Sequence, residues 1–280
     1  METIFLIDDN STYARNAAEF ALQIARKAQA EIMIGTFKSP VEQSIAHFAG
    51  ASSGFSGMAD EEPSNSEYIS EYLKALNAES NDYDCGIEEV DISSMSADNL
   101  ARFINDSKAA MVIKTTHDGN HTAQTLIPVD MQAVLNRLIV PVCLVPAGWK
   151  PHLLKSMAYL TDLRYCRVDI LSHLFRVITS SDTEVYIAHM AARGNVDLSP
   201  EYATGLFSSL TVNPAFRERL FLHHIKQDDS INVADVLLNS MMTDTLVLTN
   251  HSAHFRQLIG DNLTVRNRDI IRVPLLLYPA

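Results

Sequence analysis

Histidines gather in two short segments of the sequence, each with polar or acidic neighbours. The first segment runs His117-Asp118-Gly119-Asn120-His121, and the second runs His251-Ser252-Ala253-His254. Imidazoles and carboxylates bind transition metals, and a protonated imidazole can bind a small anion. The spacing matches no recognised zinc pattern. Three interpretations stay open: solvated loop histidines, contacts to a small anion or nucleotide, and a metal site through His117, His121, His251 and His254.

Other side chains with chemical potential favour ordinary structural roles. A hydrolytic triad of Ser11, His117 and Asp9 lacks the GxSxG sequence that positions a serine nucleophile, so we do not expect an enzyme. His223-His224 falls in an expected strand, where one side chain faces inward and one outward, and we interpret the pair as strand residues rather than metal ligands.

The elements that must position these residues occur twice. VPVCLVPA (140–147) returns as VPLLLYPA (273–280), and INDSKAAMVIKTTH (104–117) aligns with LNSMMTDTLVLTNH (238–251). The starts also agree, because IFLIDD (4–9) parallels MAYLTD (157–162). Matches in the same order at a nearly constant offset indicate a duplicated domain. We predict one domain over residues 1–147 and a second, more divergent one over 152–280.

Strand and helix signals alternate within each half. In the first half we expect strands at 3–7, 31–37, 87–92, 110–114 and 140–145, and helices at 14–28, 66–79, 96–106 and 131–138. In the second half we expect strands at 156–160, 184–189, 219–225, 245–249 and 273–277, and helices at 168–179, 201–210 and 232–240. This alternation predicts an α/β fold with two tandem, doubly wound, mainly parallel five-stranded sheets flanked by helices. Pro141 and Pro274 lie inside the expected last strands, which predicts edge strands that pair with each other across the two halves.

Composition excludes several classes of function. Acidic residues exceed basic ones, the net charge is −12, and no Lys/Arg-rich stripe occurs, so we expect no nucleic-acid binding. No apolar run approaches the roughly 20 residues of a membrane span, and the N-terminus does not resemble a signal peptide. Cys85, Cys143 and Cys166 lie far apart, which is typical of a reduced, cytoplasmic protein. A Gly/Ser-rich insertion at about 38–65 predicts a long mobile loop.

The order of these elements resembles the universal stress protein family, as a tandem pair of domains. Members of that family begin with an apolar strand, an Asp-Gly-Ser sequence and an Ala-rich helix. Here Asp9-Asn10-Ser11 follows Phe5-Leu6-Ile7, and the close Val140-Pro141-Val142-Cys143-Leu144-Val145 resembles the family's last strand. The resemblance implies that Asp9 and Asp162 occupy the family's acidic position, where a carboxylate can accept hydrogen bonds from a base or a ribose. The alternative is that each carboxylate caps the following helix or its own loop.

The resemblance also implies a position for a phosphate loop. Family members that bind ATP carry G-x2-G-x9-G-[ST] after the fourth strand, and that register falls here on Thr115, Asp118, Pro128 and Val129. All three glycines are absent, and proline lacks the N–H that would contact a phosphate. In the second half the only glycine of the loop, Gly260, is two residues early. We therefore expect ATP binding to be lost in both halves, and no cofactor is firmly implied.

Together these features predict a non-catalytic, cytoplasmic stress-response protein that binds a small ligand or a protein partner. The expected pocket lies at the carboxyl ends of the strands. Its candidate residues are Asp9, Ser11, Thr116, His117 and Asp118, with Asp162, His251 and His254 in the other half. The alternatives are a nucleotide switch with an atypical phosphate loop, a metal-binding protein, and a scaffold whose halves form an internal pseudo-dimer. A homodimer is equally allowed.

Overall fold

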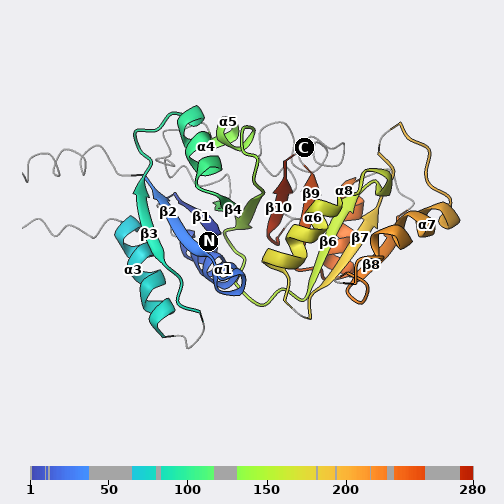
Figure 1. Cartoon of the computed structure of the whole chain (residues 1–280), viewed down its shortest axis with the longest axis horizontal. Coiled ribbons are helices and arrows are strands. Elements are labelled where there is room, and N and C mark those ends of the chain that lie inside the picture. The colour runs from blue at the N-terminus through green and yellow to red at the C-terminus, as the bar shows by residue number, and fades with distance from the viewer. Residues whose placement is uncertain are drawn as a thin grey trace, which may run out of the picture.

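One ten-stranded sheet runs through the whole molecule (Figure 1). This computed structural model describes residues 2–9, 11, 13–37, 65–79, 83–116, 131–180, 182–192, 194–214, 216–225, 230–249 and 272–279. The strand order is β3-β2-β1-β4-β5-β10-β9-β6-β7-β8. The strands are β1 (Thr3–Asp8), β2 (Glu31–Thr36), β3 (Ile87–Asp91), β4 (Ala109–Thr116), β5 (Val142–Pro146), β6 (Ser156–Thr161), β7 (Glu184–His189), β8 (Leu220–His224), β9 (Thr245–Thr249) and β10 (Leu275–Tyr278).

Helices cover both faces of this sheet. They are α1 (Ala14–Ala28), α3 (Asn65–Ala78), α4 (Ala97–Asp106), α5 (Met131–Leu135), α6 (Val168–His173), α7 (Pro200–Leu210) and α8 (Ser230–Asp235). Two expected helices change pitch at their ends, because α6 and α8 continue as single π-helical turns, Leu174–Ile178 and Val236–Ser240. Helical spacing in a sequence does not distinguish an α turn from a π turn over so few residues. The α/β fold with a mainly parallel, doubly wound sheet is confirmed.

The two halves of the sheet repeat one strand order and meet at their last strands. Reading outward from the junction, the first half runs β5-β4-β1-β2-β3 and the second runs β10-β9-β6-β7-β8. Strands β5 and β10 pair antiparallel, with Leu275 opposite Leu144, whereas the other pairs are parallel. The predicted pairing of the last strands is therefore confirmed. It joins the two expected five-stranded sheets into one, so β5 and β10 are central strands rather than edges.

The prolines stand just before these strands, not inside them as the sequence suggested. Strand β5 begins at Val142 and β10 begins at Leu275. A proline ring cannot donate to a sheet ladder, but its carbonyl can accept. Accordingly the Pro141 carbonyl accepts the N–H of Val112, and the Pro274 carbonyl accepts that of Leu246.

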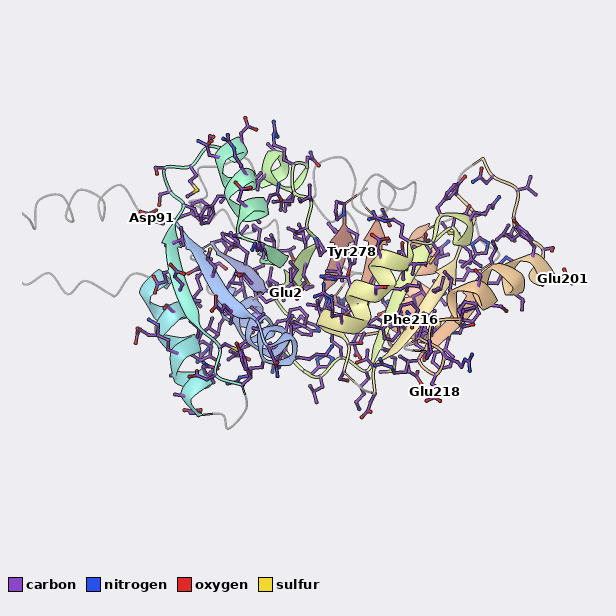
Figure 2. All side chains as sticks on the ribbon, in the orientation of Figure 1. Glu2, Asp91, Glu201, Phe216, Glu218 and Tyr278 are labelled. Atoms are coloured by element: carbon purple, nitrogen blue, oxygen red, sulfur yellow. The ribbon has the colours of Figure 1, made fainter. Side chains whose placement is uncertain are left out.

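Burial on both faces of the sheet follows from the apolar strands. Leu6 packs in a core with α1 and α6, whereas Phe5 packs in a second core with α4 and α8. Such two-sided burial is typical of parallel strands between helices. At the outer edge, β3 carries acidic residues ending at Asp91, labelled in Figure 2, which discourages pairing with another chain. Strand β3 confirms the strand expected at 87–92, and it lies at one end of the strand order.

Polar contacts also connect the two halves. His173 on α6 donates from Nε2 to the carbonyl of Ala110 in β4 at 3.0 Å, and its Nδ1 accepts from the hydroxyl of Tyr278 in β10 at 2.6 Å. Burial lowers the pKa of His173, so the neutral ring makes both bonds. Arg176 forms an ion pair with Glu2 across the same junction. Each half therefore contributes to ordering the other.

Some predictions fall on residues outside the described part of the chain. These include almost all of the expected insertion, the two histidine segments and the remaining positions of the phosphate-loop pattern. Among the described residues, no helix combines the length and apolar character that a membrane crossing requires.

Candidate functional site

The sheet has two topological switch points, where neighbouring parallel strands connect in opposite directions. We call the carboxyl ends of β1 and β4 the first switch point, and those of β6 and β9 the second. Strand β1 continues toward β2 on one side, and β4 toward β5 on the other. Ligands of open α/β sheets bind outside the strands at such points. The sequence places Asp9 and Asp162 at the two equivalent positions.

A buried ion pair marks the first switch point. Asp9 Oδ2 lies 3.5 Å from Nζ of Lys114, and the side chains are 0% and 12% exposed. The Lys114 ammonium also donates to the carbonyl of Thr115 at 2.9 Å. The N–H of Ser11 donates to the other carboxylate oxygen of Asp9. Opposite charges held in so dry a place are strongly coupled, because little water screens them.

Two hydroxyls of residues near this pair in the sequence are buried without a hydrogen-bond partner among the described residues. Ser11 Oγ and Thr115 Oγ1 have no hydrogen-bond partner among the described residues. A buried polar atom without a partner typically costs about 1–3 kcal/mol, so such atoms usually contact water, an ion or a ligand. Thr116, also predicted as a site residue, donates to the carbonyl of Val145 at 3.5 Å. The structure thus brings Asp9, Ser11 and Thr116 to one end of the sheet, with Lys114 and Thr115 added.

At the second switch point, the Asp162 carboxylate accepts four hydrogen bonds from the chain itself. Asp162 Oδ1 accepts from the N–H and Nε of Arg164, and Oδ2 accepts from the N–H of Ala192 and Nδ2 of Asn195. Burial alone would raise the pKa of Asp162, but these donors outweigh it and hold the pKa below its ordinary value. Asp162 also caps the short 3₁₀ turn Leu163–Tyr165, as the structural alternative from the sequence proposed.

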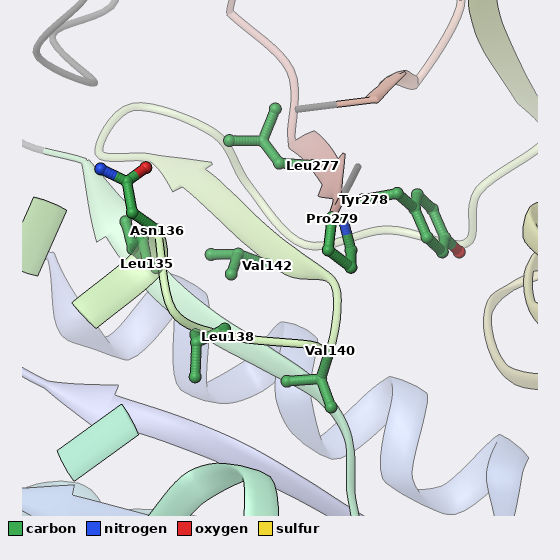
Figure 3. A pocket seen from close by; sticks show the side chains of 8 residues that line it. All are labelled: Leu135, Asn136, Leu138, Val140, Val142, Leu277, Tyr278 and Pro279. Carbon is green, nitrogen blue, oxygen red and sulfur yellow. The ribbon is translucent and has the colours of Figure 1, made fainter. Parts of the chain in front are cut away.

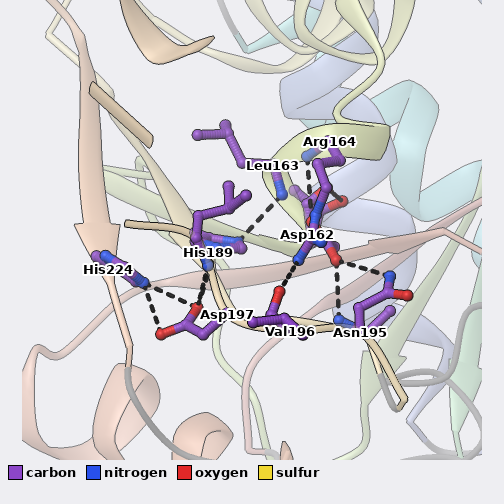
Figure 4. A network of polar contacts seen from close by, with 11 residues as sticks. Asp162, Leu163, Arg164, His189, Asn195, Val196, Asp197 and His224 are labelled. Atoms are coloured by element: carbon purple, nitrogen blue, oxygen red, sulfur yellow. Dashed lines mark hydrogen bonds and ion pairs between the residues drawn. The ribbon is translucent and has the colours of Figure 1, made fainter. Parts of the chain in front are cut away.

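Two of the four donors to the Asp162 carboxylate, from Ala192 and Asn195, belong to a connection that we call the 190–199 segment, between β7 and α7. Arg164 Nη2 donates to the carbonyl of Val196 at 2.8 Å, a second attachment of this segment (Figure 4). A third attachment is Asp197, which faces two imidazoles. The 190–199 segment is therefore tied to the carboxyl ends of β6, β7 and β8.

The imidazoles facing Asp197 end two neighbouring strands. His189 closes β7, His224 closes β8, and the two residues are opposite each other in the parallel register. His224 Nε2 lies 3.0 and 3.1 Å from the two carboxylate oxygens of Asp197, and His189 Nε2 lies 3.5 Å from Oδ1 (Figure 4). Sequence reasoning missed this cluster. The available signal was that two paired strands each end in histidine.

Burial sets the charge states of this cluster. It lowers the pKa of His189, because the imidazolium would lose hydration, and the nearby carboxylates only partly offset this. Burial would raise the pKa of Asp197, but the hydrogen bond and charge of His224 and the N–H of Leu198 lower it below its ordinary value. The cluster therefore presents a neutral buried imidazole beside an ionised carboxylate near neutral pH.

A separate apolar pocket lies at the junction of β5 and β10 (Figure 3). It is lined by Leu135, Asn136, Leu138, Val140, Val142, Leu277, Tyr278 and Pro279. The lining is mostly aliphatic and contains no charged side chain, and the Asn136 amide and Tyr278 are its polar members. The other predicted site residues, His117, Asp118, His121, His251 and His254, lie outside the described residues, and their roles stay predictions.

The fold and the first switch point together define a doubly wound α/β protein of the nucleotide-binding-like class, with an acidic residue at the end of its first strand. The model of the universal stress protein family matches residues 1–146. The chain belongs to the universal stress protein family.

Solved structures agree over the full length of the chain. A universal stress protein from Archaeoglobus fulgidus DSM 4304 is 11% identical, covers 99% of this chain and 96% of its own, and has a TM-score of 0.60. A putative universal stress protein from Pseudomonas aeruginosa UCBPP-PA14 is 10% identical, covers 100% of this chain and 93% of its own, and has a TM-score of 0.55. At these identities the likeness supports the fold alone. None of the curated proteins matches the chain significantly.

Proposed function

We propose that this protein is a tandem universal stress protein, with domains at 1–147 and 152–280, that binds a small polar ligand at the first switch point without turning it over. The observation that carries the proposal is the buried Asp9–Lys114 pair at the end of the sheet, together with the buried hydroxyls of Ser11 and Thr115, which lack partners among the described residues. A family member of this kind acts in stress physiology by changing with ligand occupancy rather than by chemistry.

The chemistry of the first switch point defines the kind of ligand. Asp9 supplies acceptors, Lys114 supplies a cation, and Ser11 and Thr115 supply hydroxyls that can donate or accept. This set suits a compact molecule that carries hydrogen-bond donors and an acidic or carbonyl group. A triphosphate fits less well, because Thr115 replaces the first glycine of the family's ATP pattern and its side chain is buried in β4. Our proposal therefore includes loss of ATP binding in this half.

The second half enters the proposal differently. The carboxylate of Asp162 accepts four hydrogen bonds from the chain itself, which supports a structural role for it. A ligand role for Asp162, His251 and His254 stays a prediction.

We further propose a cytoplasmic setting, supported by three free cysteines, of which Cys85 and Cys143 are buried. The internal pairing of β5 with β10 supports a pseudo-dimer within one chain, and it leaves open a protein partner or a homodimer.

Native mass spectrometry of the full chain, as purified, tests the ligand proposal. We expect a small-molecule mass excess that disappears in Lys114→Met and persists in the matched control Lys155→Met, whose side chain is exposed. Thermal melting with millimolar Mg-ATP should show no rise in Tm, because a ligand stabilises a fold only when it binds the folded state. A bound nucleotide, or a Tm rise with Mg-ATP, would favour the nucleotide-switch alternative. A bare chain mass would contradict the ligand proposal and favour a protein partner.

A further inference from the structure

The cluster formed by His189, Asp197 and His224 has the composition and spacing of a metal site. One ligand atom from each side chain lies within 4.8 Å of the other two. The three residues come from β7, the 190–199 segment and β8, so the backbone fixes two ligands rigidly and the third through a loop. We propose that these three side chains bind a divalent transition metal ion, with zinc as the expected ion.

The distances are close to those that zinc requires. Bonds of about 2.0 Å in a tetrahedron place ligand atoms about 3.3 Å apart. The carboxylate of Asp197 lies 3.0 Å from Nε2 of His224 and 3.5 Å from Nε2 of His189. A shift of the two rings toward each other by no more than about 1.5 Å would complete the geometry, since the widest separation is within 4.8 Å.

An unsatisfied nitrogen points independently to a ligand at this place. The His189 side chain is 0% exposed, yet its Nε2 has no hydrogen-bond partner among the described residues, and Asp197 at 3.5 Å is at ion-pair rather than hydrogen-bond distance. Figure 4 shows this ring edge directed at Asp197, with His224 on the other side of the carboxylate. Coordination would give Nε2 the partner that it lacks.

Coordination would change the role of the opposite ring nitrogen of His189. Nδ1 accepts the N–H of Leu163 at 3.1 Å, an arrangement that puts the proton on Nε2 in the metal-free protein. A metal at Nε2 displaces that proton, and the neutral ring then carries its proton on Nδ1. The Leu163 N–H would lose its acceptor, so metal binding requires a small movement of the backbone at Leu163.

The charges of the surroundings favour a cation. Asp162 lies near the cluster and adds negative potential at His189, while its neighbour Arg164 is occupied by Asp162 and by the carbonyl of Val196. Two imidazoles and one carboxylate are borderline ligands that suit zinc better than calcium or magnesium. Three protein ligands leave a fourth position for water. Metal binding here would fasten the 190–199 segment to the ends of β7 and β8.

The test is titration of the chelator-treated full chain with Zn²⁺ and, for spectroscopy, with Co²⁺. We expect one equivalent of Zn²⁺ to bind and to raise Tm, and Co²⁺ to give the visible bands of a low-coordinate site. His224→Ala and Asp197→Asn should each weaken zinc binding by more than the roughly 10–100-fold that loss of a supporting partner costs. Affinity should also fall as pH drops through the histidine range, because both imidazoles must be neutral to bind.

His223→Ala is the matched control, since His223 is the adjacent residue of β8 and packs against the ring of Tyr186. It should leave zinc affinity unchanged. His224→Gln, with circular dichroism of each variant, separates loss of a ligand from loss of folding. Absence of stoichiometric zinc binding by the parent chain would overturn the proposal. Unchanged zinc binding in His224→Ala and Asp197→Asn would also overturn the proposal. In that case, loss of zinc binding in a variant lacking His117, His121, His251 and His254 would assign the metal to the loop histidines.

Discussion

Replacing Lys114 by methionine should destabilise the protein measurably, because it leaves the buried Asp9 carboxylate without its cation. Deleting one partner of a buried ion pair typically costs about 3–5 kcal/mol. Lys114 keeps 12% of its side chain exposed and stands 3.5 Å from the carboxylate, longer than the roughly 2.7–2.9 Å of a strong charge-assisted bond. We therefore expect a loss of about 2–3 kcal/mol in the free energy of unfolding.

This loss converts into a shift in the melting temperature. An unfolding entropy of about 2.1 cal/mol/K per residue gives about 0.6 kcal/mol/K for 280 residues. Treating the transition as two-state, the Tm of Lys114→Met should fall by about 3–5 °C. Differential scanning calorimetry measures this shift. The exposed control Lys155→Met should stay within about 0.5 kcal/mol of the parent protein.

A double-mutant cycle separates the ion pair from the packing of the lysine stem. Asp9→Asn removes the charge of the partner, so Lys114→Met should cost much less in that background. We expect a coupling free energy of at least about 1 kcal/mol, above the roughly 0.3–0.5 kcal/mol at which effects count as additive. Additive effects of the two substitutions would refute the argument that Asp9 and Lys114 are strongly coupled.

Three further predictions use other parts of the fold. Gly35→Ala should cost about 1–3 kcal/mol, because its Cβ would lie 2.9 Å from Cδ1 of Ile92 and 3.0 Å from the Phe5 ring; an unchanged urea midpoint would show that the core relaxes freely. Burial lowers the pKa of His173 and His189 in the folded protein below the ordinary value of 6.5. The stability that their neutral rings contribute is therefore complete above pH 6.5, and it is lost as the pH falls from there through the lower pKa values of the folded protein. Urea unfolding between pH 7.5 and 5.5 should show this loss, and His173→Phe should reduce it. Ser199→Ala should cost about 1 kcal/mol, because Ser199 Oγ accepts the N–H of Tyr202 at the start of α7; thermal melting beside the exposed Ser172→Ala checks this.

The sequence predicted most of the fold because its signals are local or repeated. Apolar strands at fixed spacing and the duplicated VP-apolar ending were enough to predict parallel strands and the β5–β10 pairing. The sequence predicted two sheets with edge strands at this junction, although pairing of the two last strands makes one continuous ten-stranded sheet. Pro141 and Pro274 suggested edge strands because the expected strands included them, but each ring stands one residue before the ladder begins.

The site was harder to predict because its partners are distant in sequence. Asp9 and Ser11 follow a strand and were easy to identify, but Lys114 reaches Asp9 from 105 positions away. His189 and Asp197 drew no attention, since one ends a strand and the other lies in a connection without a motif. Only the register of β7 with β8 places His189 opposite His224. Pairing register across strands is tertiary information that short-range patterns do not contain.

The two switch points show how one topology supports different roles. Each has an aspartate after its first strand that forms an ion pair, Asp9 with Lys114 at 3.5 Å and Asp162 with Arg164 at 2.9 Å. Asp162 also accepts hydrogen bonds from Ala192 and Asn195 of the 190–199 segment. Substituting Asp162 therefore releases the 190–199 segment and should lower stability, while substituting Asp9 should change ligand occupancy as well. Because a fold alone does not define a function, the attachment of the 190–199 segment to Asp162 is what supports our proposal of a structural role for Asp162 and a ligand site at Asp9.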